Sequence, residues 1–118
     1  KIFADDSIQV SATCVRVPVF YGHSEAVQIE THNPISEADV RDLLANAPGV
    51  TVIDERKDGG YPTAVHDSAG QDAVFVGRIR QDISISNGIS LWVVADNVRK
   101  GAALNSVQIA EELIKSYL

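Results

Sequence analysis

The chain has 118 residues, of which 45% are hydrophobic and 22% charged, as expected for one globular domain. Its formal net charge of −6 argues against nucleic acid or an anionic membrane as the main partner, because both select a basic surface. No apolar run approaches the roughly 18 residues of a membrane span. The single cysteine excludes an intrachain disulfide and indicates a reducing, cytoplasmic location.

The first third of the chain predicts two strands and the start of a helix. Residues 8–20 are rich in Val, Ile and Thr and alternate in part, which predicts a strand that runs into Pro18. Apolar and polar residues alternate over 27–31, which predicts a second strand. Ser36, with Asp39 three residues later, has capping-box spacing, so we expect a helix to begin there.

The middle of the chain predicts three strands and a long loop. A short strand is predicted at 50–54, and the polar segment 55–70, with its glycines and proline, is typical of a loop. Further strands are predicted at 72–82 and 89–96. The Asn-Gly pair at 87–88 is typical of a type I′ hairpin turn.

The last segment, 101–118, predicts a second helix, because apolar residues from Ala103 to Tyr117 recur at helical spacing. One domain, 1–118, with two helices and about five strands predicts an α+β fold. We expect a mixed, largely antiparallel sheet with helices packed on one face. The opening strand has no sequence partner before it, and methionine is absent even at position 1. Both observations indicate a piece of a longer protein.

Two polar residues stand out in the apolar segment 13–26. Arg16 is either an arginine at a strand end with its stem buried, or a planar fork for an anionic substrate. His23 follows a glycine at a predicted bend. It is either a structural histidine or a proton carrier aimed into a cleft, since histidine side chains titrate near neutral pH.

The other candidate side chains favour structural roles. Cys14 alternates inward in the predicted strand and is expected to be a buried, inert thiol. His32 and His66 lie in polar loops, and the three histidines have no metal-ligand spacing, so we expect no metal site. Arg78 and Arg80 are most simply a solvated strand face, with an anion or subunit contact as the alternative.

The segment after the last predicted strand has an unusual set of amides. Asn97 ends that strand and is either a turn residue or a hydrogen-bonding group. Asn105 and Gln108 lie one turn apart on the final helix, where a surface helix more often carries Glu or Lys. Side-chain amides suit contacts with another amide or with buried backbone.

Three segments occur in order and together resemble the C-terminal portion of aspartate-semialdehyde dehydrogenase: "VSATCVRVPVFYGHSEAV", "VFVGRIRQD" and "LWVVADNVRKGAALNSVQIAEELI". The resemblance covers essentially the whole chain, including the Tyr-Pro-Thr at 61–63. It implies part of a glyceraldehyde-3-phosphate-dehydrogenase-like C-terminal domain. It also implies a homo-oligomer of two or four subunits, and a final helix, 101–118, that packs on a nucleotide-binding domain absent here.

The resemblance also implies a reaction, the NADPH-dependent reductive dephosphorylation of β-aspartyl phosphate to aspartate β-semialdehyde and phosphate. This step serves lysine, threonine and methionine biosynthesis and passes through a thioacyl cysteine. By position, His23 matches the general acid/base and Arg16 the group that binds the substrate α-carboxylate. Asn97 matches a contact to the nicotinamide carboxamide of NADP, and Lys1 a contact to the substrate phosphate.

The chain also departs from the family. The nucleophilic cysteine of the family lies in an Asn-Cys-Thr-type segment that has no match here, so we expect the chain to be inactive without an N-terminal half or a second chain. One alternative is a non-catalytic assembly or dimerisation module that only inherits Arg16 and His23. Another is the related N-acetyl-γ-glutamyl-phosphate reductase, which "GRIRQD" and "DNVRKGAA" disfavour.

Overall fold

Four segments rich in β-branched residues form one sheet in the computed structural model, which describes residues 2–117. The strands lie in the order β1-β4-β3-β2. Their bounds are β1 (His23–Glu30), β2 (Val50–Val52), β3 (Val74–Asp82) and β4 (Gly88–Ala95). The central strand β4 is antiparallel to both neighbours, whereas β2 runs parallel to β3. The expected α+β fold with a mixed, largely antiparallel sheet is confirmed.

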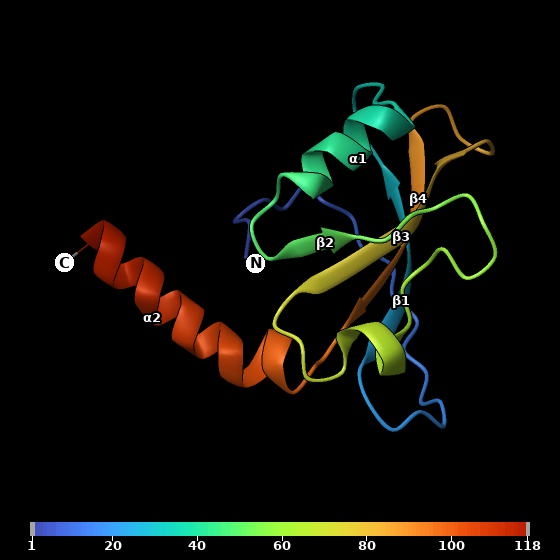
Figure 1. Cartoon of the computed structure of the whole chain (residues 1–118). Coiled ribbons are helices and arrows are strands. Elements are labelled where there is room, and N and C mark those ends of the chain that lie inside the picture. Colours follow the sequence, from blue (N-terminus) through green and yellow to red (C-terminus); the bar gives the residue numbers. More distant parts are fainter. Residues whose placement is uncertain (1, 118) are drawn as a thin grey trace.

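One face of the sheet forms the core with the helix α1 (Glu37–Ala45), which lies over β2 and β3 in Figure 1. The buried centre of this core consists of Val76, Ile79, Ile89 and Leu91. Val40 and Leu44 of α1 are among the half-buried residues that pack against it. Because side chains alternate along a strand, Ser90 and Trp92 point to the other face.

The capping box predicted for α1 is present. The Ser36 hydroxyl accepts the backbone N–H of Asp39 at 3.1 Å, and the Asp39 carboxylate accepts the backbone N–H of Ser36 at 3.3 Å. These bonds satisfy two helix-terminal donors and define the first residue of the helix. The C-cap Asn46 bonds back to the carbonyl of Asp42.

The strand predicted at 8–20 does not form, and residues of this segment such as Val10 and Val15 are 81% and 75% exposed. A strand needs a neighbour for its backbone hydrogen bonds, and among residues 2–117 the segment has none. The apolar alternation is therefore a strand pattern, but it does not show whether a neighbouring strand is present to pair with it.

Three connections differ from the sequence-based expectation. Asp82 pairs with Gly88, so residues 83–87 form the β3–β4 loop and no type I′ turn occurs at 87–88. The predicted loop 55–70 contains one helical turn, η1 (Ala64–Ser68). The final helix α2 (Leu104–Tyr117) begins after a kinked turn, η2 (Arg99–Ala103), in which Gly101 has φ +95°.

The final helix stands apart from the sheet. In Figure 1, α2 projects away from the four strands, and no residue within it is buried. Its apolar side chains are exposed, with Val107 at 54%, Ile114 at 61% and Tyr117 at 78%. A helix with an amphipathic face normally buries that face, so α2 presents an unpartnered apolar stripe.

Candidate functional site

Two of the predicted site residues lie at the same end of the sheet. His23 is the first residue of β1 and pairs in register with Ala95, the last residue of β4. Asn97 follows Ala95 by two residues and is exposed. The antiparallel pairing of β1 with β4 therefore brings together two positions that are 74 residues apart in the sequence (97 minus 23).

His23 enters β1 directly after a backbone bend at Gly22, which has φ +80°. This left-handed conformation is unfavourable for any residue with a side chain. The His23 side chain is 59% exposed, and its Nδ1 lies 3.8 Å from Oε1 of Glu25, an ion pair when the imidazole is protonated. The imidazole is thus accessible at the sheet end.

The remaining predicted site residues are less defined. Arg16 lies in the exposed segment before β1, and none of the ion pairs within residues 2–117 involves it. Lys1 lies outside the described residues. The expectation of a buried Cys14 is wrong, because this thiol is exposed on the same unpaired segment.

Asp96 shapes the turn that carries Asn97, a function that the sequence did not reveal. Its carboxylate is buried and accepts the backbone N–H of Gly70 at 2.8 Å and of Val98 at 3.0 Å. These bonds, with that from Gly70 the strongest, hold the pKa of Asp96 below its ordinary value. The sequence shows only an acid directly after an apolar strand, which does not reveal these partners.

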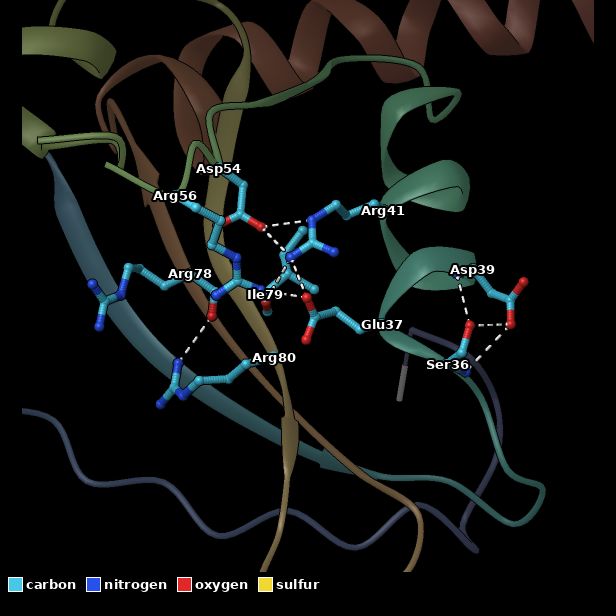
Figure 2. Close-up of polar contacts among 9 residues, drawn as sticks. All are labelled: Ser36, Glu37, Asp39, Arg41, Asp54, Arg56, Arg78, Ile79 and Arg80. Carbon is cyan, nitrogen blue, oxygen red and sulfur yellow. Dashed lines mark hydrogen bonds and ion pairs between the residues drawn. The ribbon is translucent and has the colours of Figure 1, made fainter. Parts of the chain in front are cut away.

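A polar network joins α1 to the middle of β3 (Figure 2). Arg41 of α1 donates to Asp54 at 2.8 Å, to Glu37 at 2.6 Å and to the backbone carbonyl of Ile79 at 2.9 Å. The register of β3 shifts between Gly77 and Arg80, which forms a bulge there. Arg41 therefore caps a bulged carbonyl whose residue is fully buried.

The same bulge directs the two arginines of β3. Arg78 adopts φ +55°, and its guanidinium carbon lies 5.8 Å from the centre of the Tyr61 ring, within cation–π range. Arg80 donates to the Arg78 carbonyl at 2.9 Å. In Figure 2 both side chains lie on the opposite side of β3 from α1.

The face of the sheet opposite α1 is hollowed into a groove of about 560 Å³. Ala26 and Trp92, which pair across β1 and β4, contribute to its floor, and Tyr61 and Val65 to its wall. The indole N–H of Trp92 donates to the Pro62 carbonyl at 3.0 Å, so the 61–65 segment is tied to β4. The groove is largely apolar, with arginines at its edge.

Two classes of site are not seen in the part of the chain that the structure describes. No group of three or more His, Cys, Asp or Glu side chains is placed to hold a metal ion. No described helix has the length and apolarity needed to cross a membrane.

Comparisons with known proteins identify the family. A family model described as "Semialdehyde dehydrogenase, dimerisation domain" matches residues 1–100. Proteins named aspartate-semialdehyde dehydrogenase from Shewanella violacea and Legionella pneumophila are 61% and 60% identical over 117 and 118 residues. These matches cover 99% and 100% of this chain and 34% of each relative, so the chain spans about a third of their length.

The solved structures agree. Aspartate semialdehyde dehydrogenase II from Vibrio cholerae, complexed with ASA, has a TM-score of 0.92 and 56% identity over 99% of this chain and 34% of its own. A probable aspartate-semialdehyde dehydrogenase from Pseudomonas aeruginosa has a TM-score of 0.75 and 44% identity, over 86% of this chain and 29% of its own. The chain therefore belongs to the semialdehyde dehydrogenase dimerisation-domain family.

Proposed function

We propose that this chain is the C-terminal portion of an NADPH-dependent aspartate-semialdehyde dehydrogenase, an oxidoreductase of amino-acid biosynthesis in the cytoplasm. The observation that carries the proposal is the match of nearly the whole chain, at about 60% identity, to part of the relatives of that name. The activity belongs to the complete enzyme, of which this chain supplies about a third. In that enzyme, α2, which forms most of the predicted helix 101–118, packs on the nucleotide-binding domain.

His23 is the proposed general acid/base. It accepts the proton of a cysteine thiol from another part of the polypeptide, so that the thiolate attacks the β-carbonyl and phosphate leaves. It then protonates the oxyanion formed by hydride addition, and removes that proton when the aldehyde and the thiolate separate. The exposed imidazole at the start of β1 supports this role.

Arg16 is the proposed substrate-binding residue. Its guanidinium is always charged and can bind the substrate α-carboxylate through two parallel hydrogen bonds. The exposure of Arg16 in a segment that lacks a strand partner supports a side chain that contacts something outside residues 2–117. Lys1 is proposed to contact the substrate phosphate.

Asn97 is the proposed contact to the cofactor, and its environment fits this role. Its side chain is exposed at the sheet end that carries His23. An exposed amide offers the donor and the acceptor that a carboxamide requires. NADPH, when bound, supplies the hydride.

The test uses a hybrid enzyme, the Vibrio cholerae relative with its matching third replaced by residues 1–118. We expect the hybrid to oxidise NADPH with β-aspartyl phosphate. His23→Ala should lower kcat by about 10²–10⁴-fold, whereas Arg16→Lys should mainly raise KM, by about tenfold or more. His32→Ala, an exposed histidine in a loop, is the matched control and should change neither constant.

The unmodified Vibrio enzyme is the reference for the melting temperature and the activity of the hybrid. A hybrid that has the parent's melting temperature and no activity contradicts the proposal. If His23→Ala and Arg16→Lys both keep the kinetics of the hybrid, the chain is a non-catalytic assembly module.

We propose further that the groove opposite α1 is the contact with a second copy of the complete protein. The family model is a dimerisation domain, and the groove is an open, largely apolar hollow on the sheet face. Ala26 lies exposed in this groove, whereas Ala45 lies exposed at the end of α1, on the other side of the sheet.

A matched pair of substitutions tests this contact in the hybrid enzyme. Ala26→Arg places a charge in the groove and should lower the molecular mass measured by light scattering to that of one subunit. Ala45→Arg adds the same charge to the helix side and should leave the mass unchanged. If Ala26→Arg lowers the melting temperature at unchanged mass, the groove is covered by the rest of the same polypeptide and the proposal fails.

A further inference from the structure

Gly22, which immediately precedes His23, is tightly enclosed. A Cβ atom at this position would lie 2.9 Å from Cβ of Ala64, 3.0 Å from the carbonyl oxygen of Ala95 and 3.2 Å from Oγ of Ser68. Distances this short require the neighbours to move, and two of the three neighbours belong to the turn η1. The backbone at Gly22 therefore packs directly between η1 and the end of β4.

The turn that encloses Gly22 is rigid by its own bonding. The Ser68 hydroxyl is fully buried and donates to the Ala64 carbonyl at 2.8 Å. At the start of the turn, the Asp67 carboxylate accepts the backbone N–H of Thr63 at 2.6 Å and its hydroxyl at 3.1 Å. These bonds hold the pKa of Asp67 below its ordinary value, with the Thr63 backbone bond as the largest cause.

The turn is also fixed at both ends, to β4 and to the residue that follows it. Before η1, the Pro62 carbonyl accepts the indole N–H of Trp92. After η1, the backbone N–H of Gly70 is bound by the buried carboxylate of Asp96. Since β4 is the strand that pairs with β1, the segment 62–70 is held against the strand end where His23 begins.

We infer that η1 positions His23 through Gly22. This inference rests on the proposed role of His23 in proton transfer. The imidazole is one residue from a backbone position where a side chain would displace Ala64, Ser68 or the end of β4. Gly22, Ala64 and Ser68 are positioning residues: they hold the histidine backbone so that its side chain meets the reacting atoms. A misplacement of about 1 Å at such a group costs roughly 10²-fold in rate.

Gly22→Ala in the hybrid enzyme is the direct test. We expect kcat to fall by about 10²-fold while KM for β-aspartyl phosphate stays within about twofold. Gly59→Ala is the matched control, because Gly59 has a similar φ of +73° with no heavy atom within 4 Å of a Cβ. The control carries the same backbone strain without the contact to η1, and should keep kcat.

A second variant tests the contact between Gly22 and η1 by changing a residue of η1. Ser68→Ala removes the hydroxyl that braces η1 without adding volume, and should lower kcat by about 3–10-fold at unchanged KM. Melting temperatures of all variants show whether they fold.

A double-mutant cycle separates positioning from general damage to the fold. If Gly22 acts through His23, Gly22→Ala should have no further effect on kcat in the His23→Ala background. If the two losses multiply instead, or if Gly22→Ala changes kcat no more than Gly59→Ala does, the inference is wrong. If His23→Ala keeps full activity, it is the proposed function that fails.

Discussion

Arg41 joins three segments of the fold through one guanidinium group. Its three acceptors come from α1, from the segment after β2 and from the β3 bulge, and the Asp54 side chain is only 5% exposed. Arg41→Ala would leave the nearly buried Asp54 carboxylate without this donor, and the Ile79 carbonyl with only the longer 3.4 Å bond from Arg56.

We expect Arg41→Ala to lower the free energy of unfolding of the chain by about 1–3 kcal/mol. Urea unfolding followed by the fluorescence of Trp92, the single tryptophan, measures it. Arg56→Ala is the control, because Arg56 shares Glu37 but is 66% exposed and bonds the Ile79 carbonyl only at 3.4 Å, and it should cost about 0.5 kcal/mol. Equal losses for the two variants would show that the bulge carbonyl does not depend on Arg41.

Asp96 predicts a pH dependence of stability. Its pKa is lowered in the folded chain, so its carboxylate stabilises the fold above the ordinary aspartate pKa of about 3.9, and this contribution is lost as pH falls through the folded value. Asp96→Asn should therefore be less stable than the original chain at pH 7, and the difference should shrink below about pH 4. Asp58→Asn, in an exposed loop, is the control. A difference that does not vary from pH 7 to pH 3 would contradict the assignment.

At the scale of elements, α1 is specified locally by its cap. Ser36→Ala removes the acceptor of the Asp39 N–H and should lower the free energy of unfolding by about 1 kcal/mol, measured by urea unfolding. Ser36→Asp keeps a capping oxygen and should restore most of the loss. If both variants lose the same amount, packing of α1 on the core, and not the cap, determines where the helix begins.

The elements that could be predicted from the sequence are those whose signals are local. Short-range patterns suffice for the cap at Ser36, the alternation over 27–31 and the apolar strands after residue 72. The segment 8–20 has a strand pattern, but its backbone bonds depend on a neighbour that residues 2–117 do not contain. The turn η1 was missed because neither its internal bonds, such as that from Ser68 to the Ala64 carbonyl, nor its ties to Trp92 and Asp96 produce a periodic pattern in the sequence.

The candidate site likewise has some features that were predictable from the local sequence and others that were not. His23, Arg16 and Asn97 were identifiable as unusual side chains in their local sequence, and family resemblance suggested their roles. The contribution of Asp96 and the enclosure of Gly22 were not, since both arise from segments more than 20 residues away. Contacts between segments that are distant in the sequence produce no periodic pattern of residues.

At the scale of the molecule, the exposed stripe on α2 indicates that this chain is not a complete folding unit for its final helix. Val107 and Ile114 lie one above the other on the helix and are both more than half exposed. Glu112 lies on the opposite side of the helix by its spacing from Ile114. If α2 packs on the rest of the complete enzyme as proposed, the side that carries Ile114 is buried in the hybrid and the side that carries Glu112 stays exposed. In the isolated chain both sides are exposed.

Ile114→Lys and Glu112→Lys test this asymmetry, because both place the same side chain on α2. In the isolated chain, neither should change the free energy of unfolding by more than about 0.5 kcal/mol, since both positions are exposed. In the hybrid enzyme, Ile114→Lys buries a charge and should lower the melting temperature by several degrees, whereas Glu112→Lys should not. Equal melting temperatures for the two hybrid variants would mean that this face of α2 stays in solvent, and that the helix does not dock on the nucleotide-binding domain.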